Sequence, residues 1–333
     1  MNILITGGAG FVGQRIAMEC LRRGQLELDG SPSAEIENII LTDNADPPFW
    51  HEGLRENARV TVSFGDISDE AYVKSLFDQE IHCVFHLASI VSGQGETDFD
   101  LAMRVNLDGT RYLFEAIRAQ ENNARVVFTS SVASFGGDEM PETVTDNSKQ
   151  TPRTTYGVTK AIGELLINDY SRKGFFDGRS ARLPTVIVRP GKPNLAASSF
   201  VSGLFREPLN GEPCVIPVDP SQLMPVLGYR SIANGIIKLA ELPADALGSD
   251  RGVGLPAFNA TVQDLMDSLH KAAGNRHLGE HVMKLDPVIA TICAGWPKLV
   301  DTSRAQALGL PIENTLEEIV EQYIEDYLTE PAS

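Results

Sequence analysis

Two side chains that could together move a proton stand four residues apart in the segment Tyr156-Gly-Val-Thr-Lys160. On a helix this spacing places the phenol and the ammonium group on one face, one turn apart. A phenol ordinarily ionises near about pH 10, and a neighbouring cation stabilises the phenolate and lowers that pKa towards neutrality. The pair therefore predicts a base that takes a proton from a substrate hydroxyl while hydride leaves the same carbon.

A third polar group is expected beside this pair, from Ser130 or Ser131. Both follow the run Arg125–Thr129, which reads as a buried strand that ends where a cofactor would lie. A serine hydroxyl at that point can hydrogen-bond the reacting oxygen and orient it towards the phenol. Short polar residues at a strand end also form turns, which is the structural alternative.

The elements that must position these groups begin at the N-terminus. Asn2–Thr6 reads as a buried strand and residues 11–23 as an amphipathic helix. The glycines between them fit Gly7-x-x-Gly10-x-x-Gly13 and also Gly8-x-Gly10-x-x-Gly13, and the second pattern is the dinucleotide fingerprint as usually written. Such a turn leaves N–H groups unpaired at the positive end of a helix, where a pyrophosphate binds. The segment therefore predicts a dinucleotide site.

Two aspartates at the ends of the following strands fit the adenosine half of such a cofactor. Asp43 ends the predicted strand 38–43, where a carboxylate can accept both ribose hydroxyls and would repel a 2′-phosphate. This favours NAD over NADP, and a turn-forming aspartate is the alternative. Asp66 follows the strand 59–64, and it either accepts a hydrogen bond from the adenine amino group or shapes its own turn.

A fourth buried strand is predicted at Cys83–His86, running into Leu87-Ala88-Ser89. Small residues there would let the backbone lie along the nicotinamide side of the cofactor. His86, at the end of a buried strand, is predicted to be a core histidine rather than a base.

Strands alternate with helices over residues 1–191, with long helices expected near 97–122 and 154–173 and a sixth strand at 182–189. This alternation predicts an α/β fold with a doubly wound parallel Rossmann sheet. From Lys192 prolines and glycines become dense, so residues 192–333 are expected to form mainly a smaller, C-terminal substrate-binding domain, with some segments returning to the first. An acidic helix is predicted at 314–328.

The composition excludes several classes of protein. The 333 residues are 42% hydrophobic, enough for a full core, and the formal net charge of −17 argues against nucleic acid and anionic membranes as partners. The four cysteines are scattered, as in a reduced protein. No apolar run reaches the ~18 residues of a membrane span, and the first strand begins at residue 2, so no leader peptide is expected. These features predict a cytoplasmic protein.

One metal-site pattern occurs, His277-x-x-Glu-His281, which spells a zinc-protease motif. That motif needs both histidines on one face of a helix, whereas Gly274-Asn275 ends the preceding helix and Gly279 lies inside the pattern. No metal is expected.

Taken together, the motifs resemble the extended branch of the short-chain dehydrogenase/reductase superfamily over about the first 190 residues. They are Thr6–Gly13, Gly65-Asp66, Asn106–Thr110, Ser130-Ser131, Tyr156-x-x-x-Lys160 and Arg189-Pro190. The resemblance implies that Tyr156 is the acid/base, that Lys160 also holds the nicotinamide ribose, and that Asn106 belongs to a water relay. Counting from Gly136 in the family's Ser-Ser-x-x-x-Tyr-Gly motif makes Ser131 the catalytic serine, with Ser130 as the alternative.

The resemblance also has consequences for partners and for the cofactor. The motif's tyrosine is Phe135 here, which casts doubt on activities that need a hydroxyl at that place. Members of the family often pair through the two long helices, so a homodimer is expected. The cofactor is expected to be NAD, bound by Gly7, Gly10, Phe11, Val12, Gly13, Asp43, Asp66, Ile67, Leu87, Ala88, Tyr156 and Lys160.

Within this branch the chain is most similar to dehydrogenases of short sugar acids. The insertion 24–37 and the stretches 128–136, 189–193 and 301–305 carry this similarity. It implies NAD-dependent oxidation of the C2 hydroxyl to a 2-oxo acid, with Ser89, Ser131 and Tyr156 touching the substrate. A carboxylate substrate also needs a cation or an array of hydrogen-bond donors at the mouth of the site, and Lys192 and Arg230 are the candidate cations.

Three other functions remain open. A uronate dehydrogenase would share nearly every residue named so far. A nucleotide-sugar epimerase or dehydratase would use the same Tyr156 and Lys160, but the segment 192–225 offers few basic residues for a diphosphate. A non-catalytic NAD-sensing regulator would have no use for the serine, tyrosine and lysine set.

Overall fold

The computed structural model describes residues 1–28, 33–193 and 198–328, and the chain divides into two compact units. The first unit contains Met1–Ser134, Thr154–Arg182 and Ala233–Val253, and the second contains Phe135–Arg153, Leu183–Ile232 and the residues from Gly254 onwards. The chain therefore passes between the units several times rather than once.

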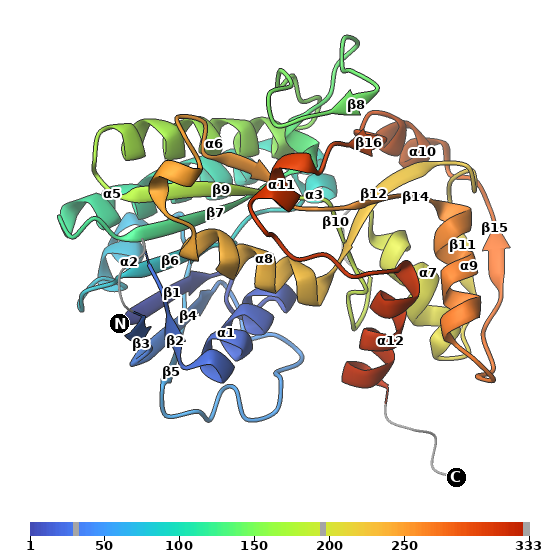
Figure 1. Cartoon of the computed structure of the whole chain (residues 1–333), viewed down its shortest axis with the longest axis horizontal. Helices are drawn as coiled ribbons and strands as arrows, with labels where there is room; N and C mark the ends of the chain where they lie inside the picture. The colour runs from blue at the N-terminus through green and yellow to red at the C-terminus, as the bar shows by residue number, and fades with distance from the viewer. Residues whose placement is uncertain (29–32, 194–197, 329–333) are drawn as a thin grey trace. The chain divides into compact units, whose positions relative to one another are not determined.

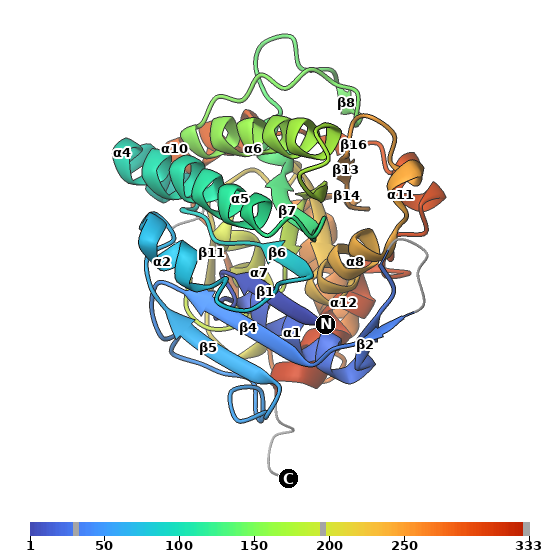
Figure 2. The same ribbon diagram turned by 90° about the vertical axis from the view of Figure 1, so that its left-hand side faces the viewer.

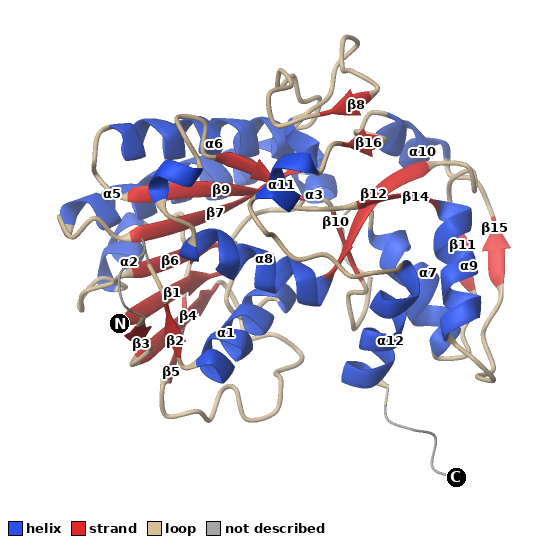
Figure 3. Cartoon of the chain, viewed as in Figure 1, coloured by secondary structure: helices blue, strands red, loops and turns tan. Residues whose placement is uncertain are grey.

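A seven-stranded sheet forms the centre of the first unit (Figures 1 and 3). In spatial order its strands are β13 (Gly252–Gly254), β9 (Asp177–Leu183), β7 (Arg125–Ser131), β6 (Cys83–His86), β1 (Asn2–Thr6), β4 (Asn38–Asp43) and β5 (Val60–Phe64). β1 pairs in parallel with β4 on one side and with β6 on the other. The strand order reverses at β1, and in open α/β sheets a ligand binds at such a reversal, outside the carboxyl ends of the strands.

Helices cover both faces of this sheet (Figure 2). α1 (Phe11–Arg23) and the later part of α8 (Tyr229–Glu241) lie on one face, where Arg23 donates to Asn234 at 2.8 Å. α2 (Glu70–Ser75), α5 (Thr110–Ala119) and α6 (Thr155–Arg172) lie on the other. Apolar side chains fill the layer between this second face and its helices, among them Leu4, Val84, Val126, Leu113, Phe114, Ile117 and Ile167. The expected doubly wound α/β fold is confirmed.

The predicted sixth strand, 182–189, is wrong in its position. The strand of the large sheet is β9, Asp177–Leu183, and after Pro184 the chain forms β10 (Thr185–Ile187) in a separate sheet. The start of β9 could not be recognised from the sequence because it carries Asp177 and Arg179, two charged residues that the structure buries. A buried charge is stable only when it is paired.

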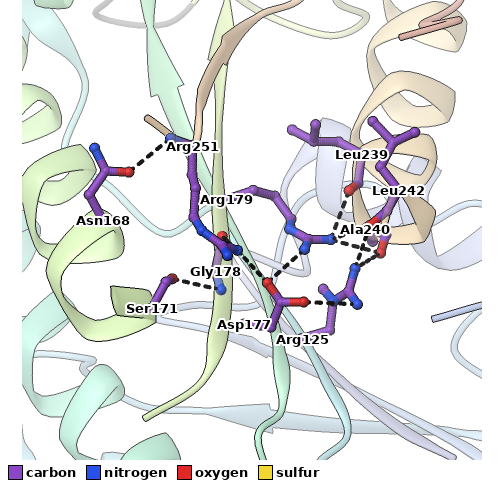
Figure 4. Close-up of polar contacts among 10 residues, drawn as sticks. All are labelled: Arg125, Asn168, Ser171, Asp177, Gly178, Arg179, Leu239, Ala240, Leu242 and Arg251. Carbon is purple, nitrogen blue, oxygen red and sulfur yellow. Dashed lines mark hydrogen bonds and ion pairs between the residues drawn. The ribbon is translucent and has the colours of Figure 1, made fainter. Parts of the chain in front are cut away.

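Figure 4 shows how those charges are paired. The Asp177 carboxylate forms ion pairs with Arg179 at 2.8 Å, with Arg125 of β7 at 3.0 Å, and with Arg251. Arg125 and Arg179 also donate to the carbonyl of Ala240, at 2.7 and 3.0 Å. That carbonyl lies at the C-terminal end of α8, the negative end of the helix dipole. The cluster therefore holds α8 against the sheet through charge as well as packing.

The long helix expected at 97–122 is broken into several pieces. They are α3 (Ser92–Thr97), α4 (Phe99–Ala102), a π-helical segment (Met103–Gly109) and α5. A π-helical segment is rare within helices and is frequently found at functional sites. The insertion predicted as a loop at 24–37 contains a short hairpin of β2 (Gln25–Leu26) and β3 (Ala34–Glu35), and residues 29–32 lie outside the described part. Two 3₁₀ turns occur at Val132–Ser134 and Ala244–Ala246.

The second unit is built from small sheets and short helices. β10, β12 (Leu223–Gly228) and β14 (Phe258–Thr261) form one sheet, and β11 (Cys214–Ile216) pairs with β15 (His281–Met283), as β8 (Thr143–Val144) does with β16 (Leu299–Val300). Its helices are α7 (Ser199–Leu209), α9 (Val262–Ala272), α10 (Pro287–Ala294), α11 (Ser303–Ala307) and α12 (Leu316–Tyr327). Among the residues that the structure describes, no helix is long and apolar enough to cross a membrane.

Candidate active site

The glycine-rich turn after β1 brings its backbone very close to the rest of the sheet. Gly7 has a φ of 66°, and a Cβ on it would lie 2.8 Å from the Ala88 backbone nitrogen after β6. A Cβ on Gly13 would lie 2.3 Å from the Gly7 carbonyl oxygen. Gly10 is the N-cap of α1 and offers no side chain to the first helical N–H groups. A helix N-terminus without a side-chain cap, directly after a tight glycine turn, is typical of a pyrophosphate site.

A cavity of about 550 Å³ opens at the carboxyl ends of β1, β4, β5 and β6. Residues expected to bind the adenosine and pyrophosphate line it, among them Gly7, Gly10, Asp43, Asp66 and Ile67. Leu87 and Ala88, expected along the nicotinamide side, line it too. Ser89, expected to touch substrate, lines it as well. Phe11, Val12 and Gly13 begin α1 immediately after the turn. The structure thus brings residues from four strand ends around one space.

The two aspartates differ in how their carboxylates are used. Asp43 accepts from the Asn44 backbone nitrogen at 2.8 Å, and burial raises the pKa of its carboxyl, opposed by hydrogen bonds from Asn44, Ala9 and Gly10. One oxygen of Asp66 accepts from both the backbone nitrogen and the hydroxyl of Ser68, at 2.8 and 2.7 Å. Asp66 therefore shapes its own turn, and it also lines the cavity; its contact with adenine stays a prediction.

The proposed base lies in the first turn of α6, which begins because the Thr154 hydroxyl accepts from the Gly157 backbone nitrogen at 3.0 Å. The Tyr156 hydroxyl is hydrogen-bonded to Ser131, the last residue of β7. Burial raises the pKa of Tyr156, and the Ser131 hydrogen bond acts in the opposite direction. Ser130 points elsewhere, because its hydroxyl donates to Glu164. Of the two serines, the structure brings Ser131 to the phenol.

Lys160 lies one turn further along α6 and is almost fully buried, 3% exposed. Its ammonium donates to the Thr129 carbonyl at 2.8 Å and lies 5.4 Å from the centre of the Tyr156 ring. Burial lowers the pKa of Lys160 to about 7, and the Glu164 carboxylate opposes this change. The lysine is thus close to the phenol, in a place where burial disfavours its charged form.

Asn106 lies in the π-helical segment and is held on three sides. Its Oδ1 accepts from the Ile90 nitrogen at 2.7 Å, and its Nδ2 donates to the Ile90 carbonyl at 3.1 Å. Nδ2 also donates to the Thr159 hydroxyl at 3.2 Å, which in turn donates to the Tyr156 carbonyl. The Asn106 side chain therefore connects the segment after β6 to the start of α6.

The two cations expected to hold a carboxylate lie in the second unit and differ in their surroundings. Lys192 is exposed. Arg230 donates to Asp326 at 2.6 Å and to Glu325 at 2.8 Å, and the hydrogen bond that it donates to Asp326 is the main reason why the pKa of Arg230 is raised. The structure therefore favours a structural role for Arg230, which fastens α12 to the start of α8.

Sequence reasoning missed several residues of the site. The cavity is also lined by Thr6, Thr42, Asn44, Gly65, Ile90, Gln94, Leu101 and Val105. Asn44 follows Asp43 directly and could have been found from that position. Gln94, Leu101 and Val105 come from the broken helical segment, whose course the sequence did not indicate. Among the described residues, no group of three histidine, cysteine or acidic side chains could hold a metal ion, and His281 lies in β15.

Comparison of the sequence with known proteins identifies the family to which the chain is similar. A model described as the NAD dependent epimerase/dehydratase family matches residues 3–251. D-erythronate dehydrogenase from Cupriavidus necator is 45% identical over 326 residues, which cover 98% of this chain and 98% of that protein. D-erythronate dehydrogenase from Haemophilus influenzae is 38% identical over 325 residues, with 98% and 99% covered.

A solved structure is also similar to this chain in its fold. The crystal structure titled as the nucleoside-diphosphate-sugar epimerase from Agrobacterium tumefaciens has a TM-score of 0.89 and 39% sequence identity. The match covers 98% of this chain and 94% of that one. Both dehydrogenase and epimerase names therefore occur among relatives that span the whole chain.

Proposed function

The chain belongs to the NAD-dependent epimerase/dehydratase family, the extended branch of the short-chain dehydrogenases and reductases, and from this premise we propose that it oxidises the C2 hydroxyl of a short sugar acid. D-Erythronate, giving 2-oxo-D-erythronate, is the first candidate. The observation that carries the proposal is the meeting of Ser131, Tyr156 and Lys160 at the end of β7 and the start of α6.

The residues of the first unit fit NAD. The turn at Gly7 would hold the pyrophosphate, because a Cβ there would fill the space between the turn and the Ala88 backbone. Asp43 would accept the adenosine ribose hydroxyls, and its partly buried carboxylate would repel a 2′-phosphate. Lys160 would hold the nicotinamide ribose. When bound, NAD accepts the hydride that leaves the substrate carbon.

The chain's own residues perform the proton transfer. The Ser131 hydroxyl would hydrogen-bond the C2 oxygen and hold it towards the phenol. The Tyr156 phenolate would take the C2 hydroxyl proton as the C2–H bonding pair departs as hydride, so that a carbonyl forms at C2. Burial raises the pKa of Tyr156, so phenolate formation depends on positive charge nearby. The Lys160 ammonium would supply it.

A carboxylate on the substrate needs a cation, and we assign this role to Lys192 rather than to Arg230. Lys192 is exposed, whereas Arg230 is held by two acidic side chains of α12. Lys192→Met is expected to raise the KM for the acid without changing the KM for NAD. Arg230→Lys is the matched control, and it should lower thermal stability and leave the KM for the acid unchanged.

The direct test is NADH formation by the purified protein with NAD and a panel of aldonic and uronic acids, D-erythronate among them. Tyr156→Phe should lower turnover by about 10²–10⁴-fold, the usual contribution of a general base, with NAD affinity retained. A preference for a uronic acid would make the protein a uronate dehydrogenase. No NADH with any acid would refute the proposal.

The alternative with a specific observation behind it is a nucleotide-sugar epimerase, the name attached to the Agrobacterium tumefaciens structure. Such an enzyme would interconvert sugar epimers with no net formation of NADH. Conversion of a nucleotide sugar by the wild type, together with inactivity towards all sugar acids, would favour it.

We further propose a homodimer formed through the helices near 97–122 and 154–173, in a cytoplasmic protein. Leu165 on α6 is 65% exposed and Phe99 on α4 is 60% exposed, so each helix presents a large apolar side chain that a second copy could cover. Light scattering should give twice the chain mass for the wild type, and Leu165→Glu should shift it to the monomer. A monomeric wild type would exclude the dimer.

A further inference from the structure

Glu164 on α6 and Arg182 on β9 form a buried ion pair near the proposed catalytic groups. The two side chains are 3% and 4% exposed. Arg182 reaches the carboxylate with two nitrogens, Nη2 at 2.7 Å and Nε at 2.9 Å from Oε2. Gly252 covers the pair so closely that a Cβ on it would lie 2.6 Å from Arg182 Nη2 and 2.9 Å from Glu164 Oε2.

This pair is connected to the reacting groups through β7. Glu164 follows Lys160 by one helical turn, on the same side of α6. The Lys160 ammonium donates to the Thr129 carbonyl, and the next residue, Ser130, donates its hydroxyl to Glu164. Lysine and glutamate are therefore both tied to consecutive residues of β7, immediately before Ser131.

The charged and titratable groups that face Lys160 in the described part of the chain come from three elements. On its own helix it faces Tyr156 and Glu164. From β6 it faces His86, whose ring is neutral because burial, followed by the charge of Lys160, lowers its pKa to about 3. From β9, Arg182 stands behind Glu164. Glu164 is thus the nearby carboxylate that opposes the loss of the lysine's charge.

We propose that Glu164 is a positioning residue for the reaction, which holds the positive charge on Lys160, and that Arg182 limits the strength of this effect. The inference rests on the proposed function in taking Tyr156 and Lys160 as the reacting pair. Removing the charge of Glu164 leaves Arg182 uncompensated, so Lys160 becomes neutral more easily and stabilises the phenolate less. Removing Arg182 as well restores the net charge of the region.

Three variants separate this electrostatic role from a structural one: Glu164→Gln, Arg182→Met and the double substitution. Removing one partner of a buried pair destabilises a fold, whereas removing both is often neutral, so the double variant keeps the test open if Glu164→Gln does not fold. A cooperative thermal unfolding transition shows which of the variants are folded. Lys160→Arg identifies the Lys160 signal in the ¹³C spectrum of protein carrying ε-labelled lysine.

The midpoint of the Lys160 titration should fall by about one pH unit in Glu164→Gln, at the lower end of what a neighbouring charge produces. It should fall less in the double variant and should not fall in Arg182→Met. The rising limb of kcat/KM against pH for the sugar acid should move to higher pH in the same order. The inference would be overturned if the Lys160 midpoint in Glu164→Gln equalled that in the wild type. It would also be overturned if the midpoint in the double variant were as low as that in Glu164→Gln.

Failure of the proposed function gives a different result. A wild type that reduces no NAD with any sugar acid refutes that function, whereas the lysine titration is measured without substrate and still decides the role of Glu164. Loss of rate by the same factor at every pH, with an unchanged Lys160 titration, would identify the pair as structural.

Discussion

His86 lies in a chain of hydrogen bonds that fixes which ring nitrogen carries its proton. The Thr110 hydroxyl donates to the Asn106 carbonyl at 2.6 Å, so it must accept from His86 Nε2 at 2.8 Å. Nδ1 then accepts from the Thr6 hydroxyl at 2.7 Å, and Thr6 accepts from the Ala88 nitrogen at 3.3 Å. Because burial lowers the pKa of His86, the ring is neutral with its proton on Nε2, and protonating Nδ1 would remove the hydrogen bond that it accepts from Thr6.

The acid sensitivity that this creates can be worked out from the pKa of His86. Burial, and then the charge of Lys160, lowers it from an ordinary value of 6.5 to about 3. Between these two values the unfolded chain binds a proton that the folded chain does not, so the free energy of unfolding falls as the pH falls. The slope is about 1.4 kcal/mol per pH unit, which gives a loss of about 2 kcal/mol at pH 5 relative to neutral pH.

The measurement compares urea unfolding of the wild type with that of His86→Gln at neutral pH and at about pH 5. A glutamine amide can accept from Thr6 and donate to Thr110 but does not titrate, so the stability difference between the two proteins should change by about 2 kcal/mol. His82→Gln, at a side chain that is 40% exposed, controls for the substitution itself. The same difference at both pH values, or an NMR titration of His86 between pH 5 and 8, would refute the reasoning.

Three further predictions concern the rest of the first unit. Gly7→Ala places a Cβ 2.8 Å from the Ala88 nitrogen at a φ of 66°, so NAD affinity measured by calorimetry should fall at least about tenfold, a cost of about 1.4 kcal/mol. Asp43→Ser removes the charge that repels a 2′-phosphate, so the ratio of kcat/KM for NAD to that for NADP should fall by about tenfold or more. Asp177→Asn leaves three guanidinium groups around a neutral side chain, and urea unfolding should show a loss of about 3–5 kcal/mol. Unchanged values in any of these assays would contradict the corresponding contact.

The elements that the sequence predicts well are those whose stability comes from local patterns. Asn2–Thr6 is an uninterrupted apolar run before a glycine turn, and the structure forms β1 over the same residues. Strands Asn38–Asp43 and Cys83–His86 follow the same rule and match β4 and β6. A buried parallel strand needs apolar residues on both faces, so its pattern is visible without knowledge of the fold.

The elements that the sequence misses are those stabilised by partners far along the chain. β9 reads as polar because it carries Asp177, Arg179 and Arg182. Arg179 pairs with Asp177 on the same strand and donates to the Ala240 carbonyl. Asp177 and Arg182 are buried against charges from other elements. Arg125 and Glu164 supply two of these charges, from β7 and α6. The course of the helix around Asn106 was missed for a related reason, since the π-helical turn shows no distinct pattern of residue types.

The proposed reacting pair, Tyr156 and Lys160, could be recognised in the sequence because both side chains lie on one helix at a fixed spacing. Tyr156, Lys160 and Glu164 recur every four residues on α6, and only the first two belong to a recognisable motif. Lowering the pKa of Lys160 from 10.5 to about 7 corresponds to a cost on the order of 5 kcal/mol for folding with the lysine charged. A fold selected for stability alone would place an apolar side chain there. This position instead holds a lysine, with the Glu164 carboxylate one helical turn away. Such an arrangement is expected where the reaction rather than packing determines the residue type.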